Sequence, residues 1–209
     1  MKLFKFYILF LTLATNVGLF AGEIDLADQL LQSYHNHENI PLVSSTHPDL
    51  SIAQAYLVQS DYVKKRLAGE KPAGFKAGLT AKSVQQKFNV NEALAGVLFA
   101  NGDFTNIPSI KRSQFKRLML ETELGFEIGK AITAPISNVT ELKSFIEAVF
   151  PVIELPDLGF KAKPKGIDII AANVGSAAFI KGKPVRHFTQ WDLNALTVTL
   201  TQDGKVVNA

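Results

Sequence analysis

The chain has 209 residues, of which 47% are hydrophobic and 20% are charged, and its formal net charge is +3. This length and composition suit one globular domain with a real core, and the small charge does not indicate a nucleic-acid partner. The densest basic run, Lys111–Arg117, is typical of a solvated loop. Cysteine is absent, which excludes disulfides and thiol catalysis. Any chemistry must therefore come from carboxylates, Lys, His, hydroxyls or a metal held by oxygen.

The first 21 residues differ in character from the rest. Lys2 and Lys5 precede an apolar stretch that ends at the small residue Ala21, and a polar, acidic segment follows. This order is typical of a secretory signal peptide over residues 1–21. An uncleaved membrane anchor is the alternative, although the stretch is short for a bilayer span. Either interpretation predicts an exported protein. Cleavage, which we favour, predicts a periplasmic or secreted protein with no stable membrane association.

Two helices are expected in the segment 22–70. The first, Glu23–His37, carries apolar residues at helical spacing. The second is predicted to begin after a cap at Asp49 or Ser51 and to end at Gly69.

The remaining part, 71–209, is expected to be rich in strands, and together with the helices it would form one domain over 22–209. Its strand candidates are short and apolar: Ala73–Ala81, Leu94–Gly102, Arg117–Gly129 and Pro151–Asp157. Between the last two, an apolar stripe through Ile146 and Val149 predicts a helix that starts at Asn138 and is stopped by Pro151.

A hairpin is predicted at Asp203–Gly204 near the end of the chain. The sequence stops at Ala209, within the return strand, which leaves an edge that a folded domain would normally cover. Two explanations are open. Either another subunit of a homo-oligomer covers this edge, or the sequence is a fragment that lacks its final strands, which is the interpretation we favour.

Acidic residues alternate along the longest strand candidate. Glu121 and Glu123 are two residues apart, so a strand directs both carboxylates to the same face. Two carboxylates aimed at one place are costly to bury unless a cation lies between them, and hard divalent ions prefer such oxygen ligands. The alternative is an edge strand whose acidic face is solvated. Glu127 is expected to be the solvent-facing member of the series.

A third acid and a lysine favour the cation. Glu154 lies within an apolar strand candidate that one predicted helix separates from Glu123, and such a connection can place two strands side by side. Lys76 lies between Gly74 and Gly78 in a strand of small residues. Lys76 is therefore the candidate cationic residue of the site, with an exposed Lys on an edge strand as the alternative.

Six motifs in order resemble the 2-keto-4-pentenoate hydratase family, which lies within the fumarylacetoacetate hydrolase superfamily. The motifs span roughly residues 50–182 and are Ala55–Gln59, Gly74–Thr80, Gly96–Leu98, Leu120–Ile132, Phe150–Asp157 and Asp168–Gly182. The resemblance implies an α+β fold, a sheet-rich barrel-like roll with helices packed outside. It also implies a Mg²⁺- or Mn²⁺-dependent lyase that adds water to a 2-oxo or 2-hydroxy dienoic acid.

Site residues follow from the same resemblance. The metal-binding carboxylates of the family correspond to Glu121, Glu123 and Glu154, and its catalytic lysine corresponds to Lys76. Gln59, Asn173 and Ser176 fall in segments that border the family's substrate pocket, where a small oxo-acid would bind.

The chain departs from the family's pattern at several positions. Ala100 and Asn101 stand where relatives often carry an acid, Leu158 and Gly159 replace a Ser-Arg pair, and Ala172 replaces an Asp. Three alternatives to the hydratase are therefore open: a related decarboxylase, an acylpyruvate-type hydrolase, or a non-catalytic exported binder of small oxo-acids.

Overall fold

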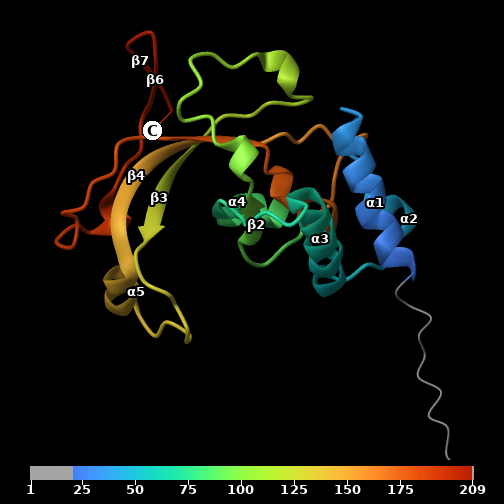
Figure 1. Ribbon diagram of the computed structural model, residues 1–209, viewed down its shortest axis with the longest axis horizontal. Coiled ribbons are helices and arrows are strands. Elements are labelled where there is room, and N and C mark those ends of the chain that lie inside the picture. The colour runs from blue at the N-terminus through green and yellow to red at the C-terminus, as the bar shows by residue number, and fades with distance from the viewer. Residues whose placement is uncertain (1–20, 209) are drawn as a thin grey trace, which may run out of the picture.

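A computed structural model describes residues 21–208, so the predicted signal peptide lies outside the described residues except for Ala21 (Figure 1). Its helices are α1 (Ala21–His35), α2 (Val43–Thr46), α3 (Ile52–Leu67), α4 (Lys82–Lys87), α5 (Val139–Phe145) and α6 (Gly166–Ala171). Its strands are β1 (Gly74–Gly78), β2 (Leu94–Leu98), β3 (Glu121–Ile128), β4 (Ile146–Leu155), β5 (Ala178–Lys181), β6 (Leu200–Gln202) and β7 (Lys205–Asn208). Short 3₁₀ turns occur at Ala100–Gly102, Arg112–Gln114, Asn173–Gly175 and Leu193–Ala195.

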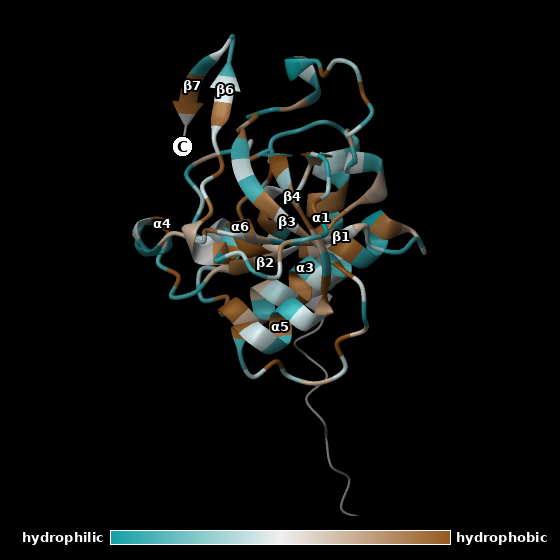
Figure 2. Cartoon of the chain, turned by 90° about the vertical axis from the view of Figure 1, so that its left-hand side faces the viewer, coloured by the Kyte–Doolittle hydropathy of each residue, from teal (hydrophilic) through white to brown (hydrophobic). Residues whose placement is uncertain are grey.

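The described strands form three antiparallel sheets. β1 pairs with β2, β4 lies between β3 and β5, and β6 pairs with β7 in the predicted hairpin. Figure 1 shows the long, curved β3–β4 pair on one side of the molecule and α1 and α3 on the other, with β2, the partner of β1, between them. In both ribbon views the β6–β7 hairpin projects away from the rest of the molecule (Figure 2).

The hydrophobic core lies where the helices meet strand β2, which contributes Leu94 and Val97. α1 packs on α3, and α3 packs on α6. The fully buried side chains include Leu26 of α1, Val58 of α3 and Ile170 of α6. Burial of such aliphatic side chains contributes roughly 1.5–3 kcal/mol each, so this core holds β2 against the helices, and β1 is held by its pairing with β2.

Helix α3 starts and ends as its sequence predicts. The Ser51 side chain accepts a hydrogen bond from the Gln54 backbone N–H, and the Gln54 side chain bonds back to the Ser51 backbone, which completes a capping box. The helix ends at Ala68 in a left-handed conformation, followed by Gly69.

The predicted helix before Pro151 is wrong in its second half. Asn138 caps α5 as expected, but the helix ends at Phe145, and β4 runs from Ile146 through Pro151. Apolar residues at Ile146 and Val149 fit a helical stripe and a buried strand equally well, and pairing with β3 decides for the strand. Pro151 is tolerated because β5 pairs with β4 only from Val152 onward, so no ladder donor is missing on that side.

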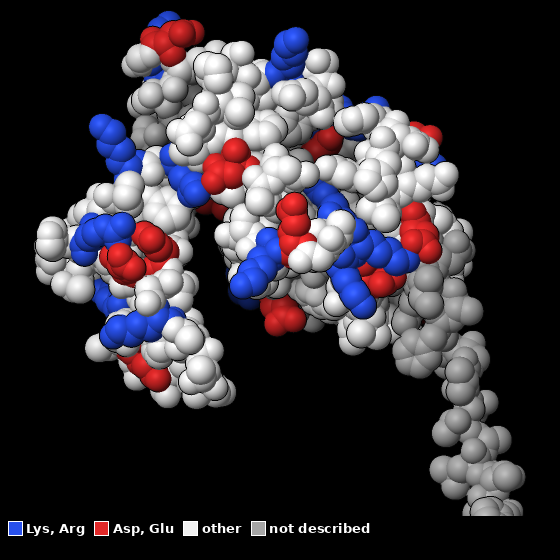
Figure 3. Space-filling model, viewed as in Figure 1, with Lys and Arg blue, Asp and Glu red and all other residues white. Residues whose placement is uncertain are grey.

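The mixed helix-and-sheet class agrees with the sequence prediction. Within residues 21–208 the three sheets are not joined into one closed barrel, so the barrel-like roll stays a prediction. None of the helices over the described residues is both long enough and apolar enough to cross a bilayer. On the face seen in Figure 3, acidic and basic side chains are interspersed, in keeping with the small net charge.

The capping box gives a stability prediction. Ser51→Ala removes the acceptor for the Gln54 N–H and is expected to lower the free energy of unfolding by about 1 kcal/mol. Thermal and urea denaturation measure the change. Ser83→Ala is the control, since Ser83 is exposed within α4; equal losses in the two variants would contradict a stabilising cap.

Candidate functional site

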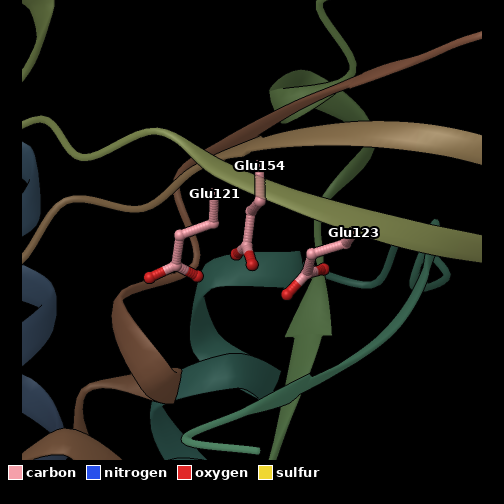
Figure 4. Close-up of side chains that lie close together, drawn as sticks. All are labelled: Glu121, Glu123 and Glu154. Atoms are coloured by element: carbon pink, nitrogen blue, oxygen red, sulfur yellow. The ribbon is translucent and has the colours of Figure 1, made fainter. Parts of the chain in front are cut away.

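Three carboxylates converge where β3 pairs with β4. Glu121 lies directly opposite Glu154 in the register, and Glu123 is two residues further along the same face of β3. One carboxylate oxygen from each residue lies within 4.8 Å of those of the other two. Figure 4 shows all three side chains pointing from the two strands toward a common space. Alternation along paired strands therefore accounts for the cluster.

Burial raises the proton affinity of these acids. Glu154 is 1% exposed, and its pKa is raised to about 7, chiefly by burial; Lys76 opposes this shift, whereas Glu123 and Glu121 add to it. Glu123 is half-buried, and burial also raises the pKa of its carboxyl, with Lys76 lowering it and Glu121 raising it. A cation at this position would stabilise the ionised forms of both.

Lys76 reaches the carboxylates from β1. It pairs opposite Gly96 of β2, and its side chain is only 3% exposed, so it is not the solvated lysine of the alternative interpretation. Its Nζ donates to Glu154 Oε1 and, at 3.2 Å, to the backbone carbonyl of Val174. Gly96 leaves room for the aliphatic part of Lys76, because a Cβ there would lie 3.0 Å from the Lys76 Cγ.

The donor set fits a divalent cation. The second oxygen of Glu154, Oε2, is buried and has no hydrogen-bond partner among the described residues, which is costly for an ionised group. Three carboxylates also outnumber the single ammonium of Lys76. Carboxylate oxygens are the ligands that Mg²⁺, Mn²⁺ and Ca²⁺ prefer. Glu121, Glu123 and Glu154 are therefore the residues that would hold such an ion.

A left-handed turn lies against Lys76. Asn173, Val174 and Gly175 have φ values of 53°, 54° and 64°. For a β-branched residue such as Val174 this conformation costs on the order of 1–3 kcal/mol. Val174 is 4% exposed, and its side chain lies so close to Gly78 that a Cβ at Gly78 would overlap it.

The three residues expected near the substrate lie in structural contacts around this turn. Gln59 of α3 donates its amide to the carbonyls of Ala95 and Ile170, at 2.9 and 3.0 Å. The Asn173 amide bonds both the N–H and the carbonyl of Val97, each at 2.8 Å, and its side chain is fully buried. These bonds use the amide groups of Gln59 and Asn173 to fasten strand β2.

Ser176 follows the turn and is 6% exposed. Its carbonyl accepts a hydrogen bond of 3.2 Å from Arg66, whose guanidinium stacks between the rings of Tyr34 and Phe99. Arg66 therefore connects α3 and α1 to the turn.

Glu127 and Asp157, two further acids near these strands, lie outside the cluster. Glu127 is exposed, as expected, and pairs with Arg186 at 3.5 Å. The Asp157 carboxylate accepts from the backbone N–H groups of Lys116, Arg117 and Gly159, so it fixes the approach to β3.

Sequence reasoning missed the turn and its carbonyl. A backbone carbonyl carries no residue-type signal, and a valine gives no indication of positive φ. Asn173 and Gly175 are local hints, because asparagine and glycine are common in the left-handed region.

Comparisons with known proteins agree with this architecture, although no family model matches the chain. A 2-keto-4-pentenoate hydratase of Paraburkholderia xenovorans (strain LB400) is 27% identical over 188 residues, covering 88% of this chain and 69% of the relative. A 4-oxalocrotonate decarboxylase of Pseudomonas sp. (strain CF600) and a 2-oxo-hept-4-ene-1,7-dioate hydratase of Escherichia coli are each 26% identical and cover 87% of this chain.

Solved structures show the same fold. The 4-oxalocrotonate decarboxylase from Pseudomonas putida G7 superposes with a TM-score of 0.80 in its complex with calcium and acetate, and 0.77 in its complex with magnesium and adipate. Each match is 24% identical and covers 90% of this chain, and 71% or 72% of the solved chain. The resemblance to this family expected from the sequence motifs is confirmed.

The cluster predicts selective loss of metal binding. Glu123→Gln removes one negative ligand and is expected to abolish the rise in melting temperature that Mg²⁺ or Mn²⁺ produces. Glu127→Gln is the matched control, since it lies four residues along the same strand but is exposed. A metal-induced rise that survives in Glu123→Gln would place metal binding elsewhere.

The raised pKa of Glu154 predicts a pH dependence. The pKa of Glu154 in the folded protein, about 7, exceeds the ordinary value of 4.5. Protonation of Glu154 therefore stabilises the folded, metal-free protein at low pH, and this stabilisation is lost as the pH rises through 7. A divalent ion must displace this proton. The metal-induced rise in melting temperature is therefore expected to be larger at pH 8 than at pH 6, and the reverse order would contradict the assignment.

Proposed function

Since the chain is a relative of the 2-keto-4-pentenoate hydratase family, we propose that it is a divalent-metal-dependent hydro-lyase that acts on a 2-hydroxy or 2-oxo dienoic acid. The observation that carries the proposal is the convergence of three carboxylates and the buried Lys76, with Glu154 Oε2 lacking a hydrogen-bond partner within the part of the chain that the structure describes. Glu121, Glu123 and Glu154 would hold Mg²⁺ or Mn²⁺.

The reaction adds water to a conjugated acid. From 2-hydroxypenta-2,4-dienoate, the 2-hydroxyl loses a proton while C5 gains one, which gives the 2-oxo-3-enoate. The oxygen of water then bonds to C4 and a proton arrives at C3, yielding the 4-hydroxy-2-oxo acid. Negative charge develops on the 2-oxygen in both steps, so the site must stabilise charge there.

The chain's own residues supply part of that stabilisation. When bound, the divalent ion contributes Lewis acidity toward the carboxylate and 2-oxygen of the substrate. Lys76 donates a hydrogen bond to the 2-oxygen as charge develops, and an ammonium proton passed toward C5 is replaced by the proton that this oxygen loses. Burial of Lys76 and Glu154 excludes water from the ammonium, and an electrostatic contact of this kind is stronger where water is absent.

Other products would identify the alternatives. The same carboxylates and lysine would support decarboxylation, so release of CO₂ from 4-oxalocrotonate would assign the chain to that branch. Cleavage of an acylpyruvate would assign it to the hydrolases. Metal-dependent binding of an oxo-acid without turnover, measured by calorimetry, would favour the non-catalytic binder suggested by Ala100 and Ala172.

Three further parts of the proposal concern the whole protein. The basic and apolar leader supports export to the periplasm or beyond. The family relationship supports completion of the sheets into a barrel-like roll. The exposed β6–β7 hairpin, with Val206 63% exposed, supports a homo-oligomer in which another subunit covers it.

Loss of the dienoate absorbance in the presence of Mg²⁺ measures the reaction. Lys76→Met keeps the length of the side chain but removes its charge, and is expected to lower kcat about 10²–10⁴-fold. Lys87→Met, at an exposed lysine of α4, is the control and should retain full activity. An active Lys76→Met enzyme would contradict the role given to Lys76, and no turnover by the wild type would contradict the hydratase.

A further inference from the structure

We propose that the left-handed turn Asn173–Gly175 is a positioning device that keeps the Lys76 ammonium beside the carboxylates when a divalent cation occupies them. The inference rests on the proposed function for its catalytic consequence, but its structural claim can be tested without turnover. Asn173 and Val174 are positioning residues in this account, and Lys76 is the residue through which they act.

The hydrogen-bond acceptors of the Lys76 ammonium would respond differently to a bound divalent cation. Its Nζ has two acceptors, the Glu154 carboxylate and the Val174 carbonyl. A divalent ion held by the three glutamates would share Glu154 and repel the ammonium by like charge. The carbonyl carries no net charge to be neutralised by the ion, so it remains an acceptor. Without it, a flexible lysine stem would let the ammonium turn away.

The direction of the Val174 carbonyl is set by the backbone conformation of the turn. Val174 has φ 54° and ψ 32°, and a valine in this region is held there by its surroundings. The contacts of the turn supply that restraint from both sides. The Val174 side chain fits against Gly78, and the Gly175 carbonyl accepts from the Asp157 N–H at 2.9 Å.

Hydrogen bonds also link the turn to segments next to the site residues. Asn173 fastens the turn to Val97 on β2, the strand that pairs with β1 and therefore with Lys76. Asp157, which binds the Gly175 carbonyl, lies three residues beyond Glu154 at the end of β4. The turn is thus hydrogen-bonded to β2, the partner of the strand that carries Lys76, and to the segment that follows β4, the strand that carries Glu154. A shift of the turn would move the acceptor relative to the ammonium.

A strained backbone in a buried segment is found mainly where it serves a site. This turn is buried throughout: Asn173 and Val174 are 0% and 4% exposed, Gly175 is buried, and Ser176, which follows the turn, is 6% exposed. The polar groups of the turn and of Ser176 form hydrogen bonds with Val97, Lys76, Asp157 and Arg66 rather than with solvent. The assignment gives Asn173 a role that differs from direct contact with the substrate.

The test observes the Lys76 ammonium directly. In protein labelled with ¹⁵N-lysine, an ammonium that is buried and hydrogen-bonded exchanges its protons slowly and gives a resolved side-chain ¹H–¹⁵N signal, which Lys76→Met identifies by its loss. Spectra are recorded without metal and with saturating Mg²⁺, which is diamagnetic. The wild type is expected to retain the signal in both states.

Two variants alter the turn. Asn173→Ala frees the turn from β2, and Val174→Gly keeps the carbonyl but removes the side chain that fits against Gly78. Both are expected to keep the Lys76 signal without metal, where Glu154 still binds it, and to lose it with Mg²⁺. Ser44→Ala, which removes a hydroxyl bond to the buried Asp168, is the control for lost stability and should behave as the wild type.

The outcomes are decisive whether or not the chain turns over a dienoate. Loss of the wild-type signal on addition of Mg²⁺ would overturn the proposal, as would an unchanged signal in both turn variants with Mg²⁺. If the wild type is active, the two variants should lower kcat by up to about 100-fold, as small displacements in active sites do, with less change in KM. In a Lys76→Met background the same turn variants should cause no further loss of oxo-acid affinity by calorimetry. Additive losses there would show a role independent of Lys76.

Discussion

The site depends on one constraint: acidic side chains that point inward from neighbouring strands must be neutralised where water is scarce. Glu154 is almost fully buried beside Glu121 and Glu123, and only Lys76 among the described residues is paired with it. One ammonium cannot neutralise three carboxylates. Burial, to which the charges of Glu123 and Glu121 add, therefore raises the pKa of Glu154 in spite of Lys76. The pairing of β3 with β4, the close packing of β1 against the turn, and the glycines beside Lys76 all serve to bring these charges together.

The same constraint explains why the segments around the carboxylates are held by many side-chain hydrogen bonds. Strand β2 is held by Gln59 and Asn173, and the turn is held by Arg66 and Asp157. Ordering these groups costs conformational entropy, which their hydrogen bonds and the adjacent hydrophobic core offset. A site that stabilises charge as it develops must be formed before the substrate arrives, because rearrangement during the reaction would cost part of that stabilisation.

Much of the site could be predicted from the sequence because strand geometry is periodic. Alternation placed Glu121 and Glu123 on one face, and the strand character around Glu154 made it their neighbour. The end of α5 could not be predicted, since Ile146 and Val149 fit two periods equally well and the pairing partner decided between them. The turn could not be predicted either, because positive φ at Val174 follows from tertiary contacts rather than from local preference.

The central claim is that Glu121, Glu123 and Glu154 together hold one divalent cation. Anomalous diffraction from crystals of the protein grown with Mn²⁺ tests it most directly. The account predicts a single strong peak between the three carboxylates, within bonding distance of Glu154 Oε2 or Oε1. A peak at another position, or ordered glutamates with no peak between them at saturating Mn²⁺, would contradict it.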